Sequence, residues 1–552
     1  MGVTDCRVLL ISPRYTSNNI NMFTRLCEAV GARYPMSPLG LITVASLLPR
    51  SWSVRLIDRN TAELTMADID EANVIMTGGM ITQQHDTLDL IDLVQTRGKP
   101  VVVGGPDVTS SPHVYAKADF QVRGEAENII GTFIEAWNSG ARSGVFEGEK
   151  FQADVTKSPV PRYDLVRYEN YLLATIQFSR GCPFDCEFCD IIELYGRVPR
   201  TKTPAQMLAE FDALYQAGHR GYVFFVDDNF IGNKKQVRQF LPQLKDWQQR
   251  HRYPFEFGTQ ATVNLADDPA LLTLMREVNF ITVFFGMESP DPEILMSMQK
   301  KQNAVRNLVD SVARVHAAGI FVHAGFIIGA DGEKTSVADT IIDYIQATSI
   351  TFASAFLLIA LPITQLARRL AREGRLHPGV DLAPDGDQTA CGLNFDTRRP
   401  RRDILTDYVT VLDTVYEAGA YFARLRAEGR TVRRPKLKKG ISLRHLNRDM
   451  VALVRIMWEM TVVQPHLCRH FWVTMIDCAC HNFRALRYVL MHAVGYLDLG
   501  SYSQMISQRM KQQIHMIDHG EWTPPPRGRN AVRGQLVIPT MAKRRSPLPR
   551  LQ

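Results

Sequence analysis

Three cysteines lie close together in the middle of the chain, at Cys182, Cys186 and Cys189, with the spacing C-x3-C-x2-C. Thiolates grouped in this way are soft ligands that bind zinc or an iron–sulfur cluster. A structural zinc site needs four ligands, but the next cysteine is Cys391, and His219 stands in no ligand-like spacing. A four-iron cluster normally takes four cysteines, so three of them leave one iron open to another molecule. The spacing favours such a cluster, with a zinc knuckle or three unconnected core thiols as alternatives.

Polar and small residues follow several apolar, strand-like segments further along the chain. They are Asp227, Asp228 and Asn229, then Glu288, then Gly325 and Gly329 with Glu333 behind them. Each group alone has an ordinary explanation, because paired carboxylates often cap helices and glycines within strands often serve packing. At the carboxyl ends of barrel strands, however, polar residues are the expected binding and catalytic groups.

The segments that carry these residues alternate between strand and helix. Strand-like runs occupy 171–178, 222–226, 254–260, 280–289, 321–329 and 353–361. Amphipathic helices separate them, the first over 204–217. Six such βα units predict a partial barrel related to the (β/α)8 fold. We therefore expect an α/β protein whose cysteine loop follows the first strand of a (β/α)6 barrel.

A second alternating region precedes the barrel. Its predicted strands are 7–12, 54–58, 74–80, 100–106 and 120–125, with helices over 38–48 and 86–96. This order predicts a parallel, doubly wound, Rossmann-like sheet. Three of its strands end in small or acidic residues, namely Gly78, Gly79, Gly104, Gly105, Gly124 and Glu125. Such ends let a large flat ligand approach the backbone, although ordinary strand-to-helix turns would also explain them.

Taken in this order, the cysteine motif, Phe188 before its third cysteine and the strand-end groups resemble the radical S-adenosylmethionine (SAM) enzymes. The resemblance implies that the three cysteines hold a [4Fe–4S] cluster whose open iron binds the amino and carboxylate groups of SAM. It also implies SAM contacts at the methionine amino group from Asp227, Asp228 and Asn229. Further contacts are implied at the ribose from Glu288 and beside the adenine from Gly325 and Gly329.

The first region resembles the cobalamin-binding domain that precedes the barrel in many radical SAM enzymes. The resemblance lies in the segments PLGLITVASLL, VRLIDRN, MTGGM, VVVGGPDVTSSP and VRGEAE. The D-x-H-x-x-G motif that supplies a histidine to cobalt is absent, and His85 and His113 lie in another context. The resemblance therefore implies cobalamin, bound at the glycine-ended strands without a histidine axial ligand.

The segments TGGM, VVVGGPDVTSSP and GCPFDCEFCDIIELYGRVPRTKTP are most similar to those of the hopanoid C-2 methylases and their relatives. In that family a radical made from SAM removes hydrogen from an unactivated carbon, and methylcobalamin supplies the methyl group. The resemblance implies methylation at C-2 of a hopanoid-type lipid, with electrons from a reductase. Alternatives are a cyclase or rearrangement enzyme, a methylase of another natural product, and a non-enzymatic cobalamin or iron–sulfur sensor or carrier.

The region after the barrel is predicted to be mainly helical, with helices over 402–425, 449–462 and 467–496 and a loop over 378–396. Apolar residues are frequent in it, among them Trp458, Met460, Phe471, Trp472 and Met475. They suit a helical cap over the barrel, an apolar substrate chamber or a membrane-facing surface. The C-x-C pair Cys478 and Cys480 is interpreted as buried structure rather than a second metal site.

Two segments are strongly basic. Arg197, Arg200 and Lys202 follow the cysteine loop and either meet carboxylate or phosphate groups or form a solvated loop. The second segment, 433–448, is expected to dock on anionic lipid, where each cation adds roughly 1 kcal/mol. The mild net charge of +7 gives no reason to expect a nucleic-acid partner.

The whole sequence sets the remaining expectations. Its 552 residues suggest three domains, at 1–145, 165–375 and 376–525, with a polar connector over 141–170 and a disordered tail over 526–552. Sparse cysteines, a third of them in one motif, indicate a reducing compartment. No signal peptide or membrane-spanning run is visible. We expect a cytoplasmic protein, with peripheral contact at the inner face of the membrane left open.

Overall fold

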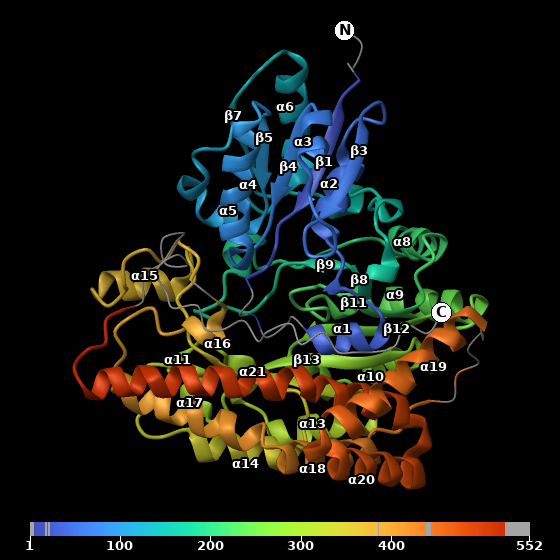
Figure 1. Cartoon of the computed structure of the whole chain (residues 1–552), viewed down its shortest axis with the longest axis vertical. Helices are drawn as coiled ribbons and strands as arrows, with labels where there is room; N and C mark the ends of the chain where they lie inside the picture. The colour runs from blue at the N-terminus through green and yellow to red at the C-terminus, as the bar shows by residue number, and fades with distance from the viewer. Residues whose placement is uncertain are drawn as a thin grey trace.

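The computed structural model of the protein describes residues 5–16, 19, 23–384, 386–435, 437 and 443–524, apart from the side chains of 443–449. Two parallel sheets lie one below the other along the long axis, and a group of helices lies beneath the second sheet (Figure 1). The chain is thus an α/β protein with a mainly helical C-terminal region, as the sequence predicts.

The first sheet has six parallel strands in the order β3-β1-β4-β5-β6-β7. They are β1 (Arg7–Ser12), β3 (Ser53–Asp58), β4 (Val74–Gly78), β5 (Val101–Gly104), β6 (Phe120–Arg123) and β7 (Gly144–Glu147). Helices cover both faces: α2 (Leu39–Leu47) and α6 (Ala126–Asn138) on one, and α3 (Met66–Glu71), α4 (Gln84–Thr96) and α5 (Pro106–Ser110) on the other. Successive side chains of a strand point to opposite faces, so Val8 and Leu10 meet one layer and Leu9 and Ile11 the other. The prediction of a doubly wound sheet is confirmed.

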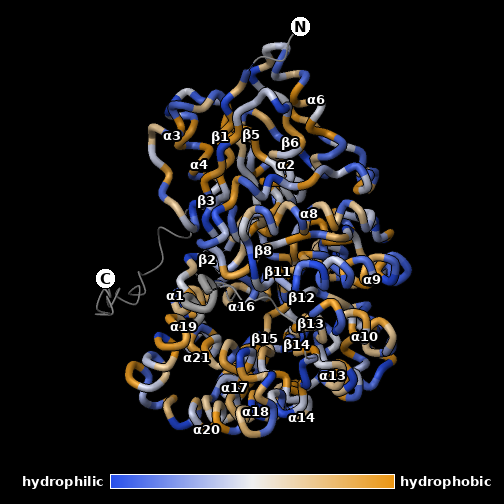
Figure 2. The backbone as a smooth tube through the Cα atoms, turned by 90° about the vertical axis from the view of Figure 1, so that its right-hand side faces the viewer, coloured by the Kyte–Doolittle hydropathy of each residue, from blue (hydrophilic) through white to orange (hydrophobic). Residues whose placement is uncertain are grey.

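The second sheet has seven parallel strands in the order β15-β14-β13-β12-β11-β8-β2. They are β2 (Tyr34–Met36), β8 (Tyr171–Ile176), β11 (Gly221–Phe225), β12 (Phe255–Ala261), β13 (Phe280–Glu288), β14 (Phe321–Ile328) and β15 (Ala353–Leu357). One face is covered by α8 (Pro204–Gln216), α9 (Lys234–Arg250), α10 (Pro269–Glu277), α13 (Leu308–Ala317) and α14 (Ala338–Thr348) (Figure 2). On that face Phe225, Phe257 and Phe280 pack with Phe211 and Trp247 of the helices. Six of these strands are the predicted βα units of the partial barrel.

The seventh strand comes from the N-terminal part of the chain. β2 extends the second sheet at β8, where Tyr34 pairs with Tyr171 and Met36 with Leu173. Just before it, α1 (Thr24–Val30) packs against α21 (Leu486–Asp518) near the opposite end of the sequence. There the carboxylate of Asp498 accepts the backbone N–H groups of Arg25 at 2.8 Å and Leu26 at 3.0 Å. Residues 24–36 therefore tie the first region to the barrel and to the last helix.

Several local predictions differ from the structure. The predicted connector over 141–170 contains β7, an edge strand whose alternately half-buried and exposed residues resemble a loop in composition. The helix predicted over 402–425 is two helices, α17 (Arg401–Val415) and α18 (Ala418–Thr431), because the Glu417 carboxylate caps α18 by accepting the N–H of Ala420 at 2.7 Å. Within the predicted loop 378–396 lies the short helix α16 (Gln388–Cys391). The predicted tail, 526–552, lies outside the described residues.

The C-terminal region contains further helical segments. They are α15 (Gln365–Arg372), α19 (Leu443–Trp458), a π-helical turn (Glu459–Val463), α20 (Pro465–Asn482) and α21. Met460, Phe471 and Met475 are buried in the core, whereas Trp458 is 51% exposed. Within the described part of the chain, no helix is both long and apolar enough to cross a bilayer.

Of the basic side chains in the segment 433–448, the structure describes Arg433 and Arg434. Arg433 is exposed, but Arg434 is just 4% exposed. Its guanidinium donates to the carbonyl oxygens of Phe280 and Gly319, both at 2.7 Å, and to Oδ1 of Asn279 at 2.6 Å. The expectation that this segment docks on lipid is therefore wrong for Arg434, which fixes the segment to the amino end of β13.

Replacing Arg434 with alanine is expected to destabilise the protein by several kcal/mol. The change leaves three buried acceptors without a donor, and each unsatisfied group costs about 1–3 kcal/mol. Thermal unfolding of Arg434→Ala measures this loss of stability. Arg433→Ala is the control, because replacing an exposed side chain should change stability by less than about 0.5 kcal/mol. Equal unfolding midpoints for both variants would contradict the structural role of Arg434.

Candidate active site

The three cysteines lie on the loop between β9 (Ser179–Arg180) and α7 (Ile191–Leu194). The N–H of Cys182 donates to the carbonyl of Gly196 at 3.2 Å, and that of Cys189 to the carbonyl of Cys186 at 3.2 Å. Gly181 begins the loop with φ +92°, and a Cβ there would lie 2.9 Å from the Gly196 oxygen. The tight entry to the loop thus requires glycine at this position.

Contacts from distant segments hold the loop in place. The N–H of Glu187 donates to the Met298 carbonyl at 3.2 Å, and its carboxylate pairs with Arg369 of α15 at 2.8 Å. The carboxylate of Asp185, in the same loop, accepts a hydrogen bond from the side-chain amide of Gln365 of α15 at 2.8 Å. The loop is therefore fixed between the barrel and the first helix after it.

The thiols have surroundings that suit an iron–sulfur cluster. Amide groups donate to two of them, Asn229 to Sγ of Cys182 at 3.8 Å and Gln302 to Sγ of Cys186 at 3.6 Å. Burial raises the pKa of the Cys182 and Cys189 thiols, so a bound cation is needed to favour their thiolates. No three His, Cys, Asp or Glu side chains among the described residues are gathered closely enough for a single metal ion. In a four-iron cluster each thiolate binds a different iron, and this donor set fits that case.

Asp227, Asp228 and Asn229 lie at the carboxyl end of β11, next to the cysteine loop. The Asp227 carboxylate accepts the N–H of Phe178 at 3.1 Å, the N–H of Ser179 and its hydroxyl at 2.6 Å, and Asp228 accepts the N–H of Gly181 at 3.0 Å. Burial raises the pKa of Asp227 to about 7 and that of Asp228 to about 6, although these hydrogen bonds act to lower both pKa values. Both carboxylates thus hold the chain that leads into the loop.

Glu288 lies at the carboxyl end of β13, on an irregular part of the strand. The register with β14 shifts between Gly286 and Glu288, and Glu288 has φ +64°, a conformation that is strained for a residue with a side chain. Its carboxylate pairs with buried Lys300 at 2.7 Å. Lys300 also lies 5.8 Å from the ring centre of Phe188 in the cysteine loop. This pairing joins the Glu288 strand end to the loop.

The two glycines of the predicted adenine contact have different surroundings. A Cβ on Gly325 would lie 2.9 Å from the Phe284 ring and 3.4 Å from the Phe356 ring. Gly329 has φ +102°, and a Cβ there would lie 2.4 Å from Leu393. Glu333 closes the turn after it by accepting the N–H groups of Gly329 at 2.6 Å and Ala330 at 2.9 Å. Gly329 and Glu333 therefore shape this turn.

Aromatic side chains line the face of the second sheet that is turned away from α8 and α9. Phe224, Phe284 and Phe356, on β11, β13 and β15, are partly exposed there. Glycines on the strands between them leave room for these rings, since Phe284 and Phe356 both cover Gly325. Across Gly258 of β12, Tyr222 reaches Thr282 with its hydroxyl. The inner wall of the partial barrel thus carries separate aromatic rings among polar side chains of the same face, such as Gln260 and His323, which are in register with Phe284.

At the carboxyl edge of the first sheet, the glycines pack against one another. A Cβ on Gly78 would lie 2.0 Å from the Gly104 oxygen, and one on Gly79 would lie 2.3 Å from the Gln83 side chain. Gly105 has φ +96°, and a Cβ there would lie 3.2 Å from the backbone nitrogen of Gly79. The glycines therefore bring the loops after β4 and β5 together, which leaves backbone rather than side chains along this edge.

The loop after β6 makes the strongest link to the cysteine loop. Glu125 pairs with Arg180 at 3.1 Å and Arg200 at 2.7 Å, and Glu127 pairs with Arg180 at 2.7 Å. All four side chains are largely buried. Burial alone would raise the pKa of Glu127, but its hydrogen bond and ion pair with Arg180 lower that pKa to about 2. Gly124, with φ +100°, turns the chain into this contact. The carboxyl edge of the first sheet thus faces the loop that carries the cysteines.

Sequence reasoning missed most of these contacts. It did not single out Arg180, Glu127, Lys300 or Arg369, and it assigned Glu125 to a ligand rather than to arginines. For Arg200, the expectation of carboxylate partners is met by Glu125. Lys202 pairs with buried Glu210, and exposed Arg197 lies 3.5 Å from Asp185. The one available signal was the presence of opposite charges in the segments VRGEAE and FSRG.

The two histidines near the first sheet differ in their surroundings. Nε2 of His113 lies 2.6 Å from the Asp381 carboxylate. His85, at the start of α4, has both ring nitrogens buried without a hydrogen-bond partner among the described residues. Neither residue stands in a D-x-H-x-x-G context.

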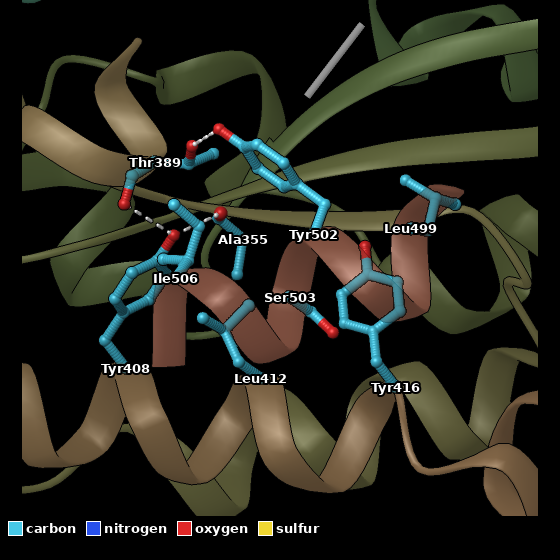
Figure 3. A pocket seen from close by; sticks show the side chains of 9 residues that line it. All are labelled: Ala355, Thr389, Tyr408, Leu412, Tyr416, Leu499, Tyr502, Ser503 and Ile506. Carbon is cyan, nitrogen blue, oxygen red and sulfur yellow. Dashed lines mark hydrogen bonds between the residues drawn. The ribbon is translucent and has the colours of Figure 1, made fainter. Parts of the chain in front are cut away.

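Two cavities lie outside the cysteine region. Between α17, α21 and β15, a cavity of about 10 Å³ has room for about one water (Figure 3). In it Tyr408 donates to the carbonyls of Ala355 and Thr389, both at 3.1 Å, and Tyr502 bonds the Thr389 hydroxyl at 2.7 Å. A second cavity of about 340 Å³ lies beside Arg434, Arg484 and Tyr488, at the amino end of β13. The first is too small for any organic substrate.

Comparison with known families and structures defines the class of protein. Residues 176–345 match the radical SAM superfamily, and residues 364–512 match a domain of unknown function, DUF4070. The cobalamin-dependent SAM radical enzyme OxsB, solved with aqua-cobalamin and SAM, has a TM-score of 0.59 at 14% identity over 94% of this chain and 82% of its own. The methyltransferase TsrM from Kitasatospora setae, solved with tryptophan and a SAM analogue, has a TM-score of 0.58 at 16% identity over 78% of this chain and 92% of its own. This chain therefore shares the fold of both structures.

Sequence relatives narrow the class further. An uncharacterized methyltransferase of Synechocystis sp. is 40% identical over 92% of this chain and 94% of its own length. Hopanoid C-2 methylase of Rhodopseudomonas palustris is 34% identical over 84% of this chain and 87% of its own length. The chain therefore belongs to the radical SAM methyltransferase family that includes these proteins, and it is an enzyme.

Proposed function

We propose that the protein is a cobalamin-dependent radical SAM methyltransferase that acts on C-2 of a hopanoid-type lipid. The observation that carries this proposal is the set of aromatic rings on the inner wall of the partial barrel beside the cysteine loop. Phe224, Phe284 and Phe356 are partly exposed there, and aromatic rings suit contact with a polycyclic hydrocarbon. Similarity to hopanoid C-2 methylase over most of both chains supports the same substrate class.

The residues that would hold the cofactors are those described above. The cysteine loop would bind a [4Fe–4S] cluster, and the carboxyl edge of the first sheet would bind cobalamin without a histidine ligand. Contacts to SAM are assigned to Asp227, Asp228, Asn229, Glu288, Gly325 and Gly329. Contacts to cobalamin are assigned to Gly78, Gly79, Gly104, Gly105, Gly124 and Glu125. When bound, these cofactors supply the radical that removes hydrogen and the methyl group that replaces it.

The chain itself contributes position and exclusion of water. Asp227 and Asp228 fix the backbone that enters the cysteine loop, and Asn229 and Gln302 hold thiols through their amide groups. The ion pairs of Arg180 keep the first sheet against this loop, so ligands on the two would face each other. Aromatic rings on the inner wall keep water from a reactive carbon centre. We also propose a cytoplasmic location, peripheral contact with the membrane and a reductase as electron donor.

The test is a methylation assay with the fully loaded enzyme. Protein reconstituted without oxygen with iron, sulfide and cobalamin, then given SAM, a reductant and a hopanoid, should yield a product heavier by one methyl group. Deoxyadenosine and S-adenosylhomocysteine should form in step with it. Deoxyadenosine without S-adenosylhomocysteine would instead indicate a cyclase or rearrangement enzyme. Turnover of a water-soluble compound alone would overturn the lipid substrate. Nitrogen splitting from a protein histidine in the paramagnetic resonance spectrum of bound cob(II)alamin would contradict cobalamin binding without a histidine axial ligand.

A further inference from the structure

The helix α19 has apolar side chains on two sides. Ile456 and Ala452 face the core and are at most 8% exposed. Met450, Val454 and Trp458 recur every four residues and therefore share the opposite side of the helix, where they are 51%, 62% and 51% exposed. A helix that only covers a core has polar residues on its outer side, so this outer side has another use.

Further exposed apolar residues follow α19 in the chain. Val462 and Val463 of the π-helical turn are 51% and 43% exposed, and Val473 and Ile476 of α20 are 48% and 60% exposed. Phe483, directly after α20, is 73% exposed. Both Figure 1 and Figure 2 place α19 and α20 in the lower part of the molecule, away from the first sheet. We name the exposed residues Met450, Val451, Val454, Met457, Trp458, Val462, Val463, Val473, Ile476 and Phe483 the apolar strip.

Exposed cations lie around the apolar strip. Three exposed cations stand on the same helices or beside Phe483, namely Arg455, Arg469 and Arg484. Two carboxylates on these segments whose side chains the structure describes are paired, Glu459 with Arg25 at 3.1 Å and Asp477 with Arg430. Arg484 also borders the cavity of about 340 Å³ at the amino end of β13. An apolar surface with exposed arginines at its margin suits a partner that is apolar inside and negatively charged at its surface.

We propose that the apolar strip docks the protein on an anionic lipid bilayer, with α19 and α20 lying in the plane of the headgroups. Trp458 has the amphipathic ring that favours the membrane interface. The cations at the margin meet lipid phosphates, and the valine and isoleucine side chains enter the acyl region. This inference rests on the proposed function, because a hopanoid-type substrate resides in such a bilayer. It assigns membrane contact to the apolar strip rather than to buried Arg434.

Flotation of the full, cofactor-loaded protein with vesicles tests the proposal. Wild-type protein should float with vesicles of phosphatidylcholine and phosphatidylglycerol at low salt, and less with phosphatidylcholine alone. The double variant Val454→Asp with Ile476→Asp should lower the bound fraction at least about tenfold, because charged side chains do not enter the acyl region. Val145→Asp is the matched control, since Val145 is 55% exposed on edge strand β7 of the first sheet. It should bind as the wild type does.

Three results would overturn the proposal. They are no flotation of the wild type, equal flotation of the double variant, and concentration-dependent dimers that the double variant abolishes while vesicles bind neither protein. Circular dichroism and SAM cleavage check that the variants are folded. Hopanoid presented in detergent micelles separates this test from that of the proposed function. Vesicle binding without methylation in micelles would remove the substrate assignment alone, whereas methylation in micelles without vesicle binding would remove the docking surface alone.

Discussion

Replacing Cys186 with alanine is expected to abolish both the bound iron–sulfur cluster and the cleavage of SAM. Three thiolates are available in the loop, and each is needed for one iron, so two cannot retain a four-iron cluster with a single open site. Iron content and visible absorbance after reconstitution measure the first effect, and deoxyadenosine formation measures the second. The same loss is expected for Cys182→Ala and Cys189→Ala.

A buried cysteine elsewhere provides the control. Cys478 in α20 is 1% exposed, compared with 7% for Cys186, and lies in a part of the chain assigned no cofactor. Cys478→Ala should keep the cluster and the SAM cleavage, with at most a modest loss of stability from the lost packing. Wild-type iron content and deoxyadenosine formation in Cys186→Ala would refute the ligand assignment.

Replacing Arg180 with methionine is expected to lower stability by about 3–5 kcal/mol, because it leaves the buried Glu127 carboxylate without an ion-pair partner and Glu125 with Arg200 alone. Glu125 and Glu127 lie at the start of α6, directly after strand β6 of the first sheet, and Arg180 lies two residues before Cys182. The change should therefore also reduce the amount of cluster retained, and it should broaden the spectrum of the cluster that remains. Thermal unfolding and electron paramagnetic resonance of the reduced cluster measure the two effects.

Two further variants make the Arg180 prediction specific. Arg197 pairs with Asp185 at 3.5 Å but is 56% exposed, so Arg197→Met should cost less than about 1 kcal/mol. Arg180→Lys keeps the charge but loses the planar fork that reaches two carboxylates, and should give an intermediate loss. If Arg180→Met unfolds at the wild-type temperature, the ion pairs do not hold the two regions together.

The periodicity of the sequence is enough to predict both sheets, because long apolar strands recur between amphipathic helices. It fails for β2 and β7, which have three and four residues and are recognisable only by their pairing with β8 and β6. It fails also at Glu417, where one capping carboxylate divides a continuous helical pattern. These features depend on neighbours in space rather than on neighbours in sequence.

The cysteine loop is predictable from its spacing, but its supports are not. Arg180 is separated from Glu125 and Glu127 by 55 and 53 positions, and Glu187 from Arg369 by 182. No local pattern relates such residues. Asp227 illustrates the other limit, since its place at a strand end is evident from sequence, whereas its hydrogen bonds to Phe178 and Ser179 are not. Its contact with SAM stays a prediction.

The packing of α1 on α21 has a consequence for how the protein is made. Arg25 leaves the ribosome 473 residues before Asp498, the residue that receives its backbone N–H. At about 5–20 residues per second, the interval is roughly 25 to 95 s. During this time Leu26 and Cys27, which end up 8% and 1% exposed, have no α21 to cover them. The first sheet can form early, but α1 must wait, accessible to chaperones and proteases, until translation has almost finished.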